Sequence, residues 1–191
     1  MVGLDEAGRG PLAGPVLAAA VSVNPKRVLK LSRLLKEVND SKKLSALKRE
    51  KLFKEITKHP AIQWGLGKVS EKTIDRINIF KASQLAMKKA LKQIKKPDFL
   101  ILDGNFRIPY PLPQKPIVKA DQKVFSCAAA SIIAKVARDR IMDGLSKKYP
   151  RYSFKKHKGY PTKLHFKELL KHGPSKIHRK SFGPVKACKI R

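Results

Sequence analysis

The chain has 191 residues and a mass of 21.4 kDa, and its 44 Lys and Arg residues against 14 Asp and Glu residues give a formal net charge of +30. This length suits one domain with a small appendage, and a hydrophobic content of 42% can build a core, which excludes a wholly disordered chain. So strong a positive charge indicates a polyanionic partner, either nucleic acid or an anionic membrane surface.

Membrane insertion and secretion are not expected. The longest uncharged apolar stretch, residues 10–25, is too short to span a bilayer and follows acidic residues rather than the basic segment of a signal peptide. The two cysteines, Cys127 and Cys188, cannot form a disulfide framework, and free thiols suit a reducing cytosol. We therefore expect a cytoplasmic protein that acts on nucleic acid.

The hydrophobic pattern predicts strands that alternate with helices. In chain order, strands are expected at residues 2–5, 16–23, 64–69, 99–102 and 117–118, and helices at 45–58, 71–94 and 124–145. This order indicates an α/β sheet with helices packed on it.

The last part of the chain, residues 151–191, is strongly basic, with 13 Lys and Arg residues against the single Glu168. Such a segment is either a disordered basic arm or a small packed region. Aromatic and aliphatic residues are interleaved with the charges, which favours a packed, basic helical region.

Three of the apolar runs end in acidic residues, at Asp5 and Glu6, at Asp103 and at Asp121. Carboxylates at strand ends can converge at one edge of a sheet, where they would repel one another without a cation. Oxygen ligands of this kind suit Mg²⁺ or Mn²⁺.

Each acid also has a simpler explanation. Asp103 precedes Gly104 and could be a turn residue, and Asp121 could cap the helix that begins near Val124. Asp5 and Glu6 are adjacent, so on a regular strand they point to opposite faces. The pattern alone does not decide between these explanations and a shared metal site.

Six sequence blocks, in the family's order, resemble the type 2 ribonucleases H, the ribonuclease HII family. They are Gly3–Pro15 (GLDEAGRGPLAGP), Asp40–Ser45 (DSKKLS), Asp103–Asn105 (DGN), Lys119–Asp121 (KAD) followed by Ala129–Lys135 (AASIIAK), Gly159–His165 (GYPTKLH) and His178–Phe182 (HRKSF). The related ribonucleases HIII usually carry an extra N-terminal domain and a glutamate as the fourth acid. A first strand at residue 2 and an aspartate at position 121 therefore favour ribonuclease HII.

The resemblance implies a ribonuclease H-like fold, with a mixed central sheet flanked by helices. Residues 1–148 would form the catalytic domain, and residues 149–191 a basic helical extension packed on it. The implied protein is a monomeric endonuclease that hydrolyses the RNA strand of RNA–DNA hybrids. It would also serve ribonucleotide excision repair, by incising duplex DNA on the 5′ side of a single embedded ribonucleotide and leaving 3′-hydroxyl and 5′-phosphate ends.

The same resemblance implies roles for individual residues. The catalytic and metal-binding carboxylates would be Asp5, Glu6, Asp103 and Asp121, which would hold two Mg²⁺ or Mn²⁺ ions when substrate binds. The substrate contacts would be Gly8, Arg9 and Gly10 at the ribose 2′-hydroxyl, Lys42 and Lys43 at phosphates, and Tyr160 at the sugars of the RNA–DNA junction.

Several alternatives stay open. Tyr160 could be an ordinary core residue, and Lys42 and Lys43 could be solvated charges. A zinc site is not expected, because the histidines come without a Cys pair or an HExxH spacing. Two rival functions are a non-catalytic basic RNA- or DNA-binding protein and another nuclease of the same fold, such as a junction resolvase. A pure binder, however, gains nothing from carboxylates at a phosphate surface.

Overall fold

The structure, a computed structural model, describes residues 1–27, 34, 37–38 and 44–188. Within these residues a five-stranded mixed sheet has the order β3-β2-β1-β4-β5. The strands are β1 (Val2–Ala7), β2 (Val16–Val23), β3 (Ile62–Val69), β4 (Leu100–Asp103) and β5 (Gln114–Ile117). β1 is antiparallel to β2 and parallel to β4, so the carboxyl ends of β1 and β4 lie at the same edge of the sheet.

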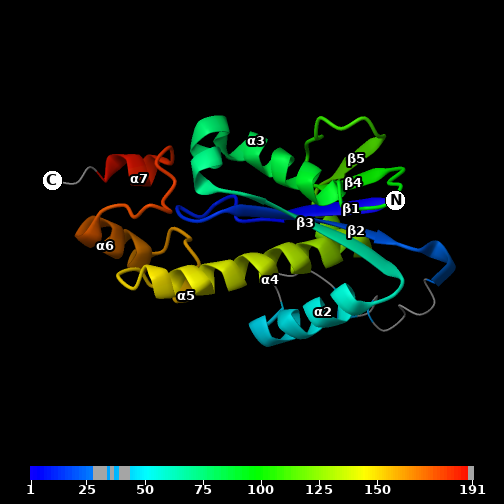
Figure 1. Cartoon of the computed structure of the whole chain (residues 1–191), viewed down its shortest axis with the longest axis horizontal. Helices are drawn as coiled ribbons and strands as arrows, with labels where there is room; N and C mark the ends of the chain where they lie inside the picture. Colours follow the sequence, from blue (N-terminus) through cyan, green and yellow to red (C-terminus); the bar gives the residue numbers. More distant parts are fainter. Residues whose placement is uncertain (28–33, 35–36, 39–43, 189–191) are drawn as a thin grey trace.

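Helices cover both faces of this sheet (Figure 1). α3 (Glu71–Leu91) packs on one face and α4 (Phe125–Lys148) on the other, with α2 (Ala46–Lys58) packed against α4. Side chains of β1 alternate between the faces: Val2 and Leu4 join the core under α3, whereas Ala7 joins the core under α4. Asp5 therefore lies on the α4 side of the sheet.

A glycine in β1 lets α4 approach the strand closely. A Cβ atom at Gly3 would lie 2.4 Å from Ser126 Oγ and 2.5 Å from the Cys127 amide nitrogen, both in the first turn of α4. A side chain at this position would push the helix away, so Gly3 sets the distance between Asp5 and the amino-terminal end of α4.

The basic C-terminal part is packed rather than extended, as expected. It contains α5 (Phe154–His157), α6 (Lys163–His172) and α7 (Gly183–Ala187). Phe154 and Leu169 are fully buried. A β-bridge between Ala13 and His178 joins this part to the loop that follows β1. In Figure 1 the blue turn after β1 accordingly lies on the same side of the molecule as α6 and α7.

Most predicted elements are confirmed, and two needed correction. The strand predicted at 117–118 lies instead at Gln114–Ile117. β5 is an edge strand, which tolerates Pro116 because one side of its backbone needs no partner. The helix predicted at 71–94 ends at Leu91 and is interrupted at Asn78, whose backbone has φ 64° and ψ 167°.

Among the described residues, no helix is both long and apolar enough to cross a membrane.

Candidate metal and nucleic-acid site

Three of the four predicted acids come together at the sheet edge where β1 and β4 end. Asp5 lies in β1, Asp103 is the last residue of β4, and Asp121 lies in the short 3₁₀ helix η2 (Ala120–Gln122) before α4. One carboxylate oxygen from each of the three lies within 4.8 Å of the others. A donor set made only of carboxylate oxygens fits a hard divalent cation such as Mg²⁺ or Mn²⁺.

The electrostatics of Asp5 show how crowded this edge is. The carboxyl group is buried, and burial together with the charges of Glu6 and Asp103 raises its pKa well above the ordinary value. A hydrogen bond from Ser131 on α4 works in the opposite direction. A divalent cation would remove the repulsion, because it supplies the positive charge that the three carboxylates lack.

Glu6, the fourth predicted acid, lies beside this group and is not one of its three members. Its charge is close enough to contribute to the raised pKa of Asp5, and its Oε1 atom lies 3.4 Å from Nη1 of Arg9. Adjacent strand residues point to opposite faces, which explains why Glu6 does not converge with Asp5. Its role as a metal ligand stays a prediction.

The structure shows how Asp103 and Asp121 are held, and it shows that Asp121 does not cap α4 through its side chain. Oδ1 of Asp103 accepts a hydrogen bond of 2.7 Å from the backbone N–H of Ala120, which ties the end of β4 to η2. Val124 is the N-cap residue of α4 and no side chain caps that helix. Asp121 is held by the turn that Lys119 begins in a left-handed conformation, at φ 57°.

Cys127 also lies close to the acids, but it is not a nucleophile. Burial, with contributions from the charges of Asp5, Asp103 and Asp121, raises the pKa of its thiol to about 12. The group is therefore a neutral thiol at physiological pH. Cys127 is fully buried and acts as a small core residue.

Gly8, Arg9 and Gly10 form the turn that follows β1, three to five residues beyond Asp5. Arg9 and Gly10 are exposed, whereas Gly8 is buried with φ 101°, a backbone conformation that favours glycine. A Cβ at Gly8 would lie 2.2 Å from Nε of Arg138. The turn is thus held tightly on its inner side and open on its outer side.

Tyr160 lies on the turn between α5 and α6 and is half-buried, so it is not fully enclosed in the core. Its ring lies 5.8 Å from Nζ of Lys135 and 5.6 Å from Cζ of Arg138. The preceding residue, Gly159, accepts a hydrogen bond of 2.7 Å from the N–H of Leu12. The turn that carries Tyr160 is therefore joined directly to the loop between β1 and β2, residues 8–15, which we call the glycine-rich loop.

Two of the predicted phosphate contacts, Lys42 and Lys43, lie outside the described residues. In the other direction, the sequence reasoning missed two arginines, Arg138 and Arg179, both of which are fully buried around the glycine-rich loop. A signal was available for Arg138, since it lies seven residues after Ser131 on the buried stripe of α4.

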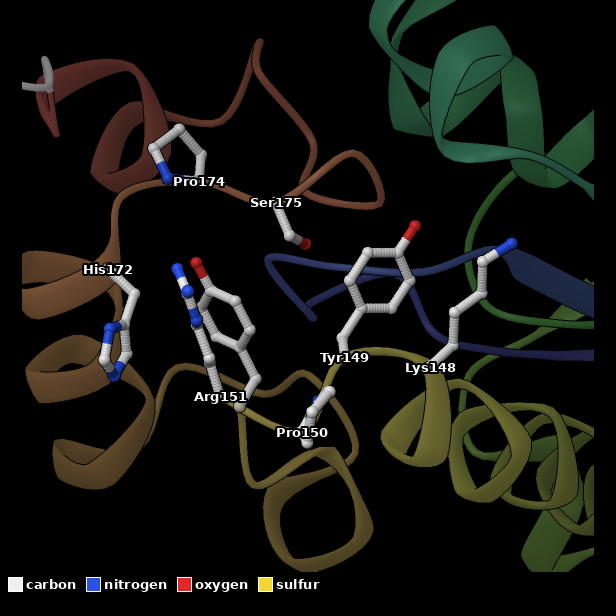
Figure 2. A pocket seen from close by; sticks show the side chains of 8 residues that line it. Lys148, Tyr149, Pro150, Arg151, His172, Pro174 and Ser175 are labelled. Atoms are coloured by element: carbon white, nitrogen blue, oxygen red, sulfur yellow. The ribbon is translucent and has the colours of Figure 1, made fainter.

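A separate hollow of about 300 Å³ opens at the end of α4, between Lys148 and the segment around Ser175 (Figure 2). Its lining includes the basic residues Lys148, Arg151 and His172. It shares no residue with the acid group, the glycine-rich turn or Tyr160, so the candidate site does not include it.

Comparisons with known proteins give matches that cover almost the whole chain. A sequence model described as Ribonuclease HII matches residues 2–185. A ribonuclease HII of Pelodictyon phaeoclathratiforme is 48% identical over 182 residues, 94% of this chain and 87% of that protein. One of Caldicellulosiruptor bescii is 52% identical over 182 residues, 94% of this chain and 84% of that protein. The crystal structure of ribonuclease H2 from Pyrococcus horikoshii superimposes with a TM-score of 0.76 at 27% identity, covering 98% of this chain and 95% of that one.

Proposed function

Because the chain belongs to the ribonuclease HII family, endoribonucleases that act on the RNA of RNA–DNA hybrids, we propose that it also incises duplex DNA at a single embedded ribonucleotide. The cut falls on the 5′ side of the ribonucleotide and leaves 3′-hydroxyl and 5′-phosphate ends, the incision that begins ribonucleotide excision repair. The observation that carries this proposal is the convergence of Asp5, Asp103 and Asp121 at the edge from which the Gly8–Gly10 turn emerges.

Asp5, Asp103 and Asp121, with Glu6 beside them, would hold the divalent cations, Mg²⁺ or Mn²⁺. When bound, such ions activate water and stabilise the charge on the leaving oxygen in phosphodiester hydrolysis. Burial and the neighbouring charges of Glu6 and Asp103 raise the pKa of Asp5, which supports this role because a bound cation would offset the cost of the buried negative charge.

Recognition of the ribonucleotide falls to the other predicted residues. The exposed backbone of Arg9 and Gly10 can approach a ribose closely and read its 2′-hydroxyl, the group that separates RNA from DNA. The half-buried ring of Tyr160 packs on the sugars at the junction. Lys42 and Lys43 contact phosphates in this proposal, on sequence grounds alone.

The organisation of the chain is also part of the proposal. We infer a catalytic domain over residues 1–148 and a substrate-holding basic region over 149–191, in a monomer that acts in the cytoplasm. The hydrogen bond between Leu12 and Gly159, 2.7 Å long, supports a recognition surface built from both parts.

The deciding experiment uses an end-labelled DNA duplex with one ribonucleotide, incubated with the protein and either Mg²⁺, Mn²⁺ or a chelator. We expect metal-dependent incision 5′ to the ribonucleotide, with no cleavage of an all-DNA duplex of the same sequence. Cleavage of a long RNA–DNA hybrid without incision at the single ribonucleotide would overturn the finer proposal. Such a result would leave the family's activity on hybrids intact.

A further inference from the structure

Two buried arginines lie against the inner side of the glycine-rich loop. Arg138 on α4 and Arg179 after the β-bridge are both fully buried. Among the described residues neither forms an ion pair with a carboxylate. A buried guanidinium group without an ion pair is costly unless its N–H groups are hydrogen-bonded. The hydrogen-bond acceptors of Arg138 and Arg179 therefore show what these two charges hold in place.

Arg179 bonds three backbone carbonyls of the loop. Its Nη2 donates to the carbonyl of Gly8 at 2.6 Å, its Nη1 to that of Arg9 at 2.9 Å, and its Nε to that of Gly14 at 3.0 Å. In a trans peptide the C=O of one residue and the N–H of the next point in opposite directions. Because the carbonyls of Gly8 and Arg9 point inward to Arg179, the N–H groups of Arg9 and Gly10 face outward.

Arg138 joins the other end of the loop to the turn that carries Tyr160. Its Nε donates to the carbonyl of Pro15 at 3.1 Å and its Nη2 to that of Ala13 at 3.2 Å. Its Nη1 donates to the carbonyl of Lys158 at 3.0 Å, two residues before Tyr160. One guanidinium therefore fixes the position of the loop relative to the tyrosine.

We propose that Arg179 and Arg138 are positioning residues that hold the two outward N–H groups of the Gly8–Gly10 turn and the Tyr160 ring in one fixed arrangement for reading a ribonucleotide. This inference rests on the proposed function, since it assigns the geometry of that recognition surface to two residues that do not touch the substrate. A lysine cannot replace either arginine, because an ammonium group is a single point and cannot reach three carbonyls in the plane of a fork.

The test compares Arg179→Lys and Arg138→Lys with the unmodified protein on the single-ribonucleotide duplex. Arg140→Lys is the matched control, because Arg140 lies on the same helix as Arg138 but pairs with Glu50 at the surface. We expect kcat to fall at least about tenfold in the first two variants, since a positioning error of about 1 Å can cost roughly a hundredfold in rate. KM should change less than about threefold, because surface lysines supply most of the binding to phosphates. The control should keep both parameters.

Amide hydrogen exchange separates positioning from a purely structural role. We expect faster exchange at Leu12 and Gly14, whose N–H groups bond to Gly159 and Ile177, with unchanged exchange in β2. Each variant is assayed at a temperature at which circular dichroism shows it folded. If Arg179→Lys does not fold, Arg138→Lys decides, since it loosens the other end of the same loop.

Three outcomes would overturn the inference. One is an unchanged kcat in a folded variant, and another is exchange that accelerates equally in the loop and in β2. The third is failure of both variants to fold while Arg140→Lys folds, which would make the arginines folding residues only. Failure of the proposed function is seen separately, in the unmodified protein, and kcat on a long RNA–DNA hybrid would then test the positioning role.

Discussion

At the scale of single residues, the candidate site is an arrangement of like charges that folding alone does not favour. Asp5, Asp103 and Asp121 offer oxygens within 4.8 Å of one another, and the pKa of Asp5 is raised by burial and by its acidic neighbours. The amide of Ala120 bonds Asp103, and Ser131 bonds Asp5, so the carboxylates are held in place despite their repulsion. The repulsion among these carboxylates lowers the stability of the metal-free protein, and a bound cation would offset it.

Asp103→Asn should therefore separate stability from chemistry. The amide keeps the shape of the side chain but removes one ligand charge, so cleavage in Mg²⁺ or Mn²⁺ should fall by at least about a hundredfold, the cost typical of losing one charge-stabilising group. The melting temperature without metal should stay the same or rise, because one repulsive charge is gone. Duplex binding, measured by fluorescence anisotropy, should be nearly unchanged.

The control for this variant is Asp98→Asn. Asp98 is exposed, lies just before the start of β4 and pairs with the terminal amine of Met1. It is therefore at the opposite end of β4 from Asp103. It should keep full activity. Near-normal turnover by Asp103→Asn in Mg²⁺ would show that this carboxylate does not hold the catalytic cation.

At the scale of elements, the sheet and the large helices could be predicted from the sequence, because their apolar residues continue over long stretches at the spacing of a strand or a helix. The strand at 16–23 and the helix from Ser45 are confirmed, and the Ser45 hydroxyl caps α2 by accepting the N–H of Lys48. The break at Asn78 and the strand through Pro116 could not be predicted, since tertiary contacts overrule local preference there.

The acids of the site were likewise identified from the sequence, but the geometry that joins them was not. Their positions at the ends of apolar runs were visible in the sequence. The turn that carries Asp121 was not, because it depends on a left-handed backbone conformation at Lys119, and such a conformation is usually predicted only at a glycine. Arg138 and Arg179 were missed for a different reason. The position of Arg138 on the buried stripe of α4 was a signal, but the partners of both arginines are backbone carbonyls far away in the chain, which the sequence does not identify.

Gly3→Ala tests how closely β1 and α4 must pack. The new Cβ would lie 2.5 Å from the backbone nitrogen of Cys127, so α4 must shift, at a cost of about 1–3 kcal/mol in the free energy of unfolding. The shift also moves Ser131 away from Asp5, so Mn²⁺ should stabilise the variant less than the unmodified protein. Thermal melting with and without Mn²⁺ measures both effects.

Gly144→Ala, in α4, provides the control for a glycine-to-alanine change that meets no neighbour. A Cβ there meets nothing within 4 Å, and replacing an exposed helical glycine by alanine should stabilise the protein by up to about 1 kcal/mol. Equal effects of the two substitutions would show that the close approach of β1 to α4 is unimportant.

The helices of the C-terminal part are joined by a chain of neutral histidines. Nδ1 of His165 lies 2.9 Å from the carbonyl of Tyr160 and must donate to it, so Nε2 of His165 accepts from Nε2 of His178 at 3.0 Å. Nδ1 of His178 then accepts the N–H of Ser175 at 2.9 Å. A further proton on either ring would set two N–H groups against each other.

Acidification between pH 6.5 and 4 should therefore remove the stabilisation that this histidine chain contributes, whereas Asp5, whose pKa is raised in the folded protein, works in the opposite direction. Burial and the nearby His165 lower the pKa of His178 from 6.5 to about 4, and burial lowers that of His165. The stabilisation is fully present above 6.5 and is lost as the pH falls, because the unfolded chain takes up the protons first, at up to about 1.4 kcal/mol per group and pH unit. Urea unfolding at pH 7.5 and 5.5 measures the loss.

His178→Asn should be less stable at pH 7.5 and should lose less on acidification. His172→Asn, at an exposed histidine, should keep the pH dependence of the unmodified protein. The same loss between the two pH values in all three proteins would assign the effect to groups outside the histidine chain.

At the scale of the whole molecule, a small negative site lies in a protein of net charge +30. The positive charge attracts a polyanion, and in the proposed function the carboxylate edge acts on it once it holds cations. Exposed lysines of α5, Lys155 and Lys156, lie five and four residues before Tyr160 and are suited to hold the duplex backbone. Lys158 is less suited, because its ammonium pairs with Asp143.

The salt dependence of duplex binding tests whether this charge acts locally or only as a net field. The logarithm of the affinity should fall linearly with the logarithm of the salt concentration, with a slope of about −0.9 for each neutralised phosphate. If Lys155 and Lys156 each contact a phosphate, changing both to Glu should make the slope shallower by about two such units.

The control changes Lys92 and Lys95 to Glu, which alters the net charge equally. These two lysines follow α3 at the edge of the sheet where β4 begins, whereas Asp103 lies where β4 ends. The control should lower the affinity only slightly and leave the slope unchanged, because no phosphate contact is lost. Fluorescence anisotropy from about 50 to 200 mM salt distinguishes the two pairs, and equal slopes would mean that Lys155 and Lys156 act only through the overall charge.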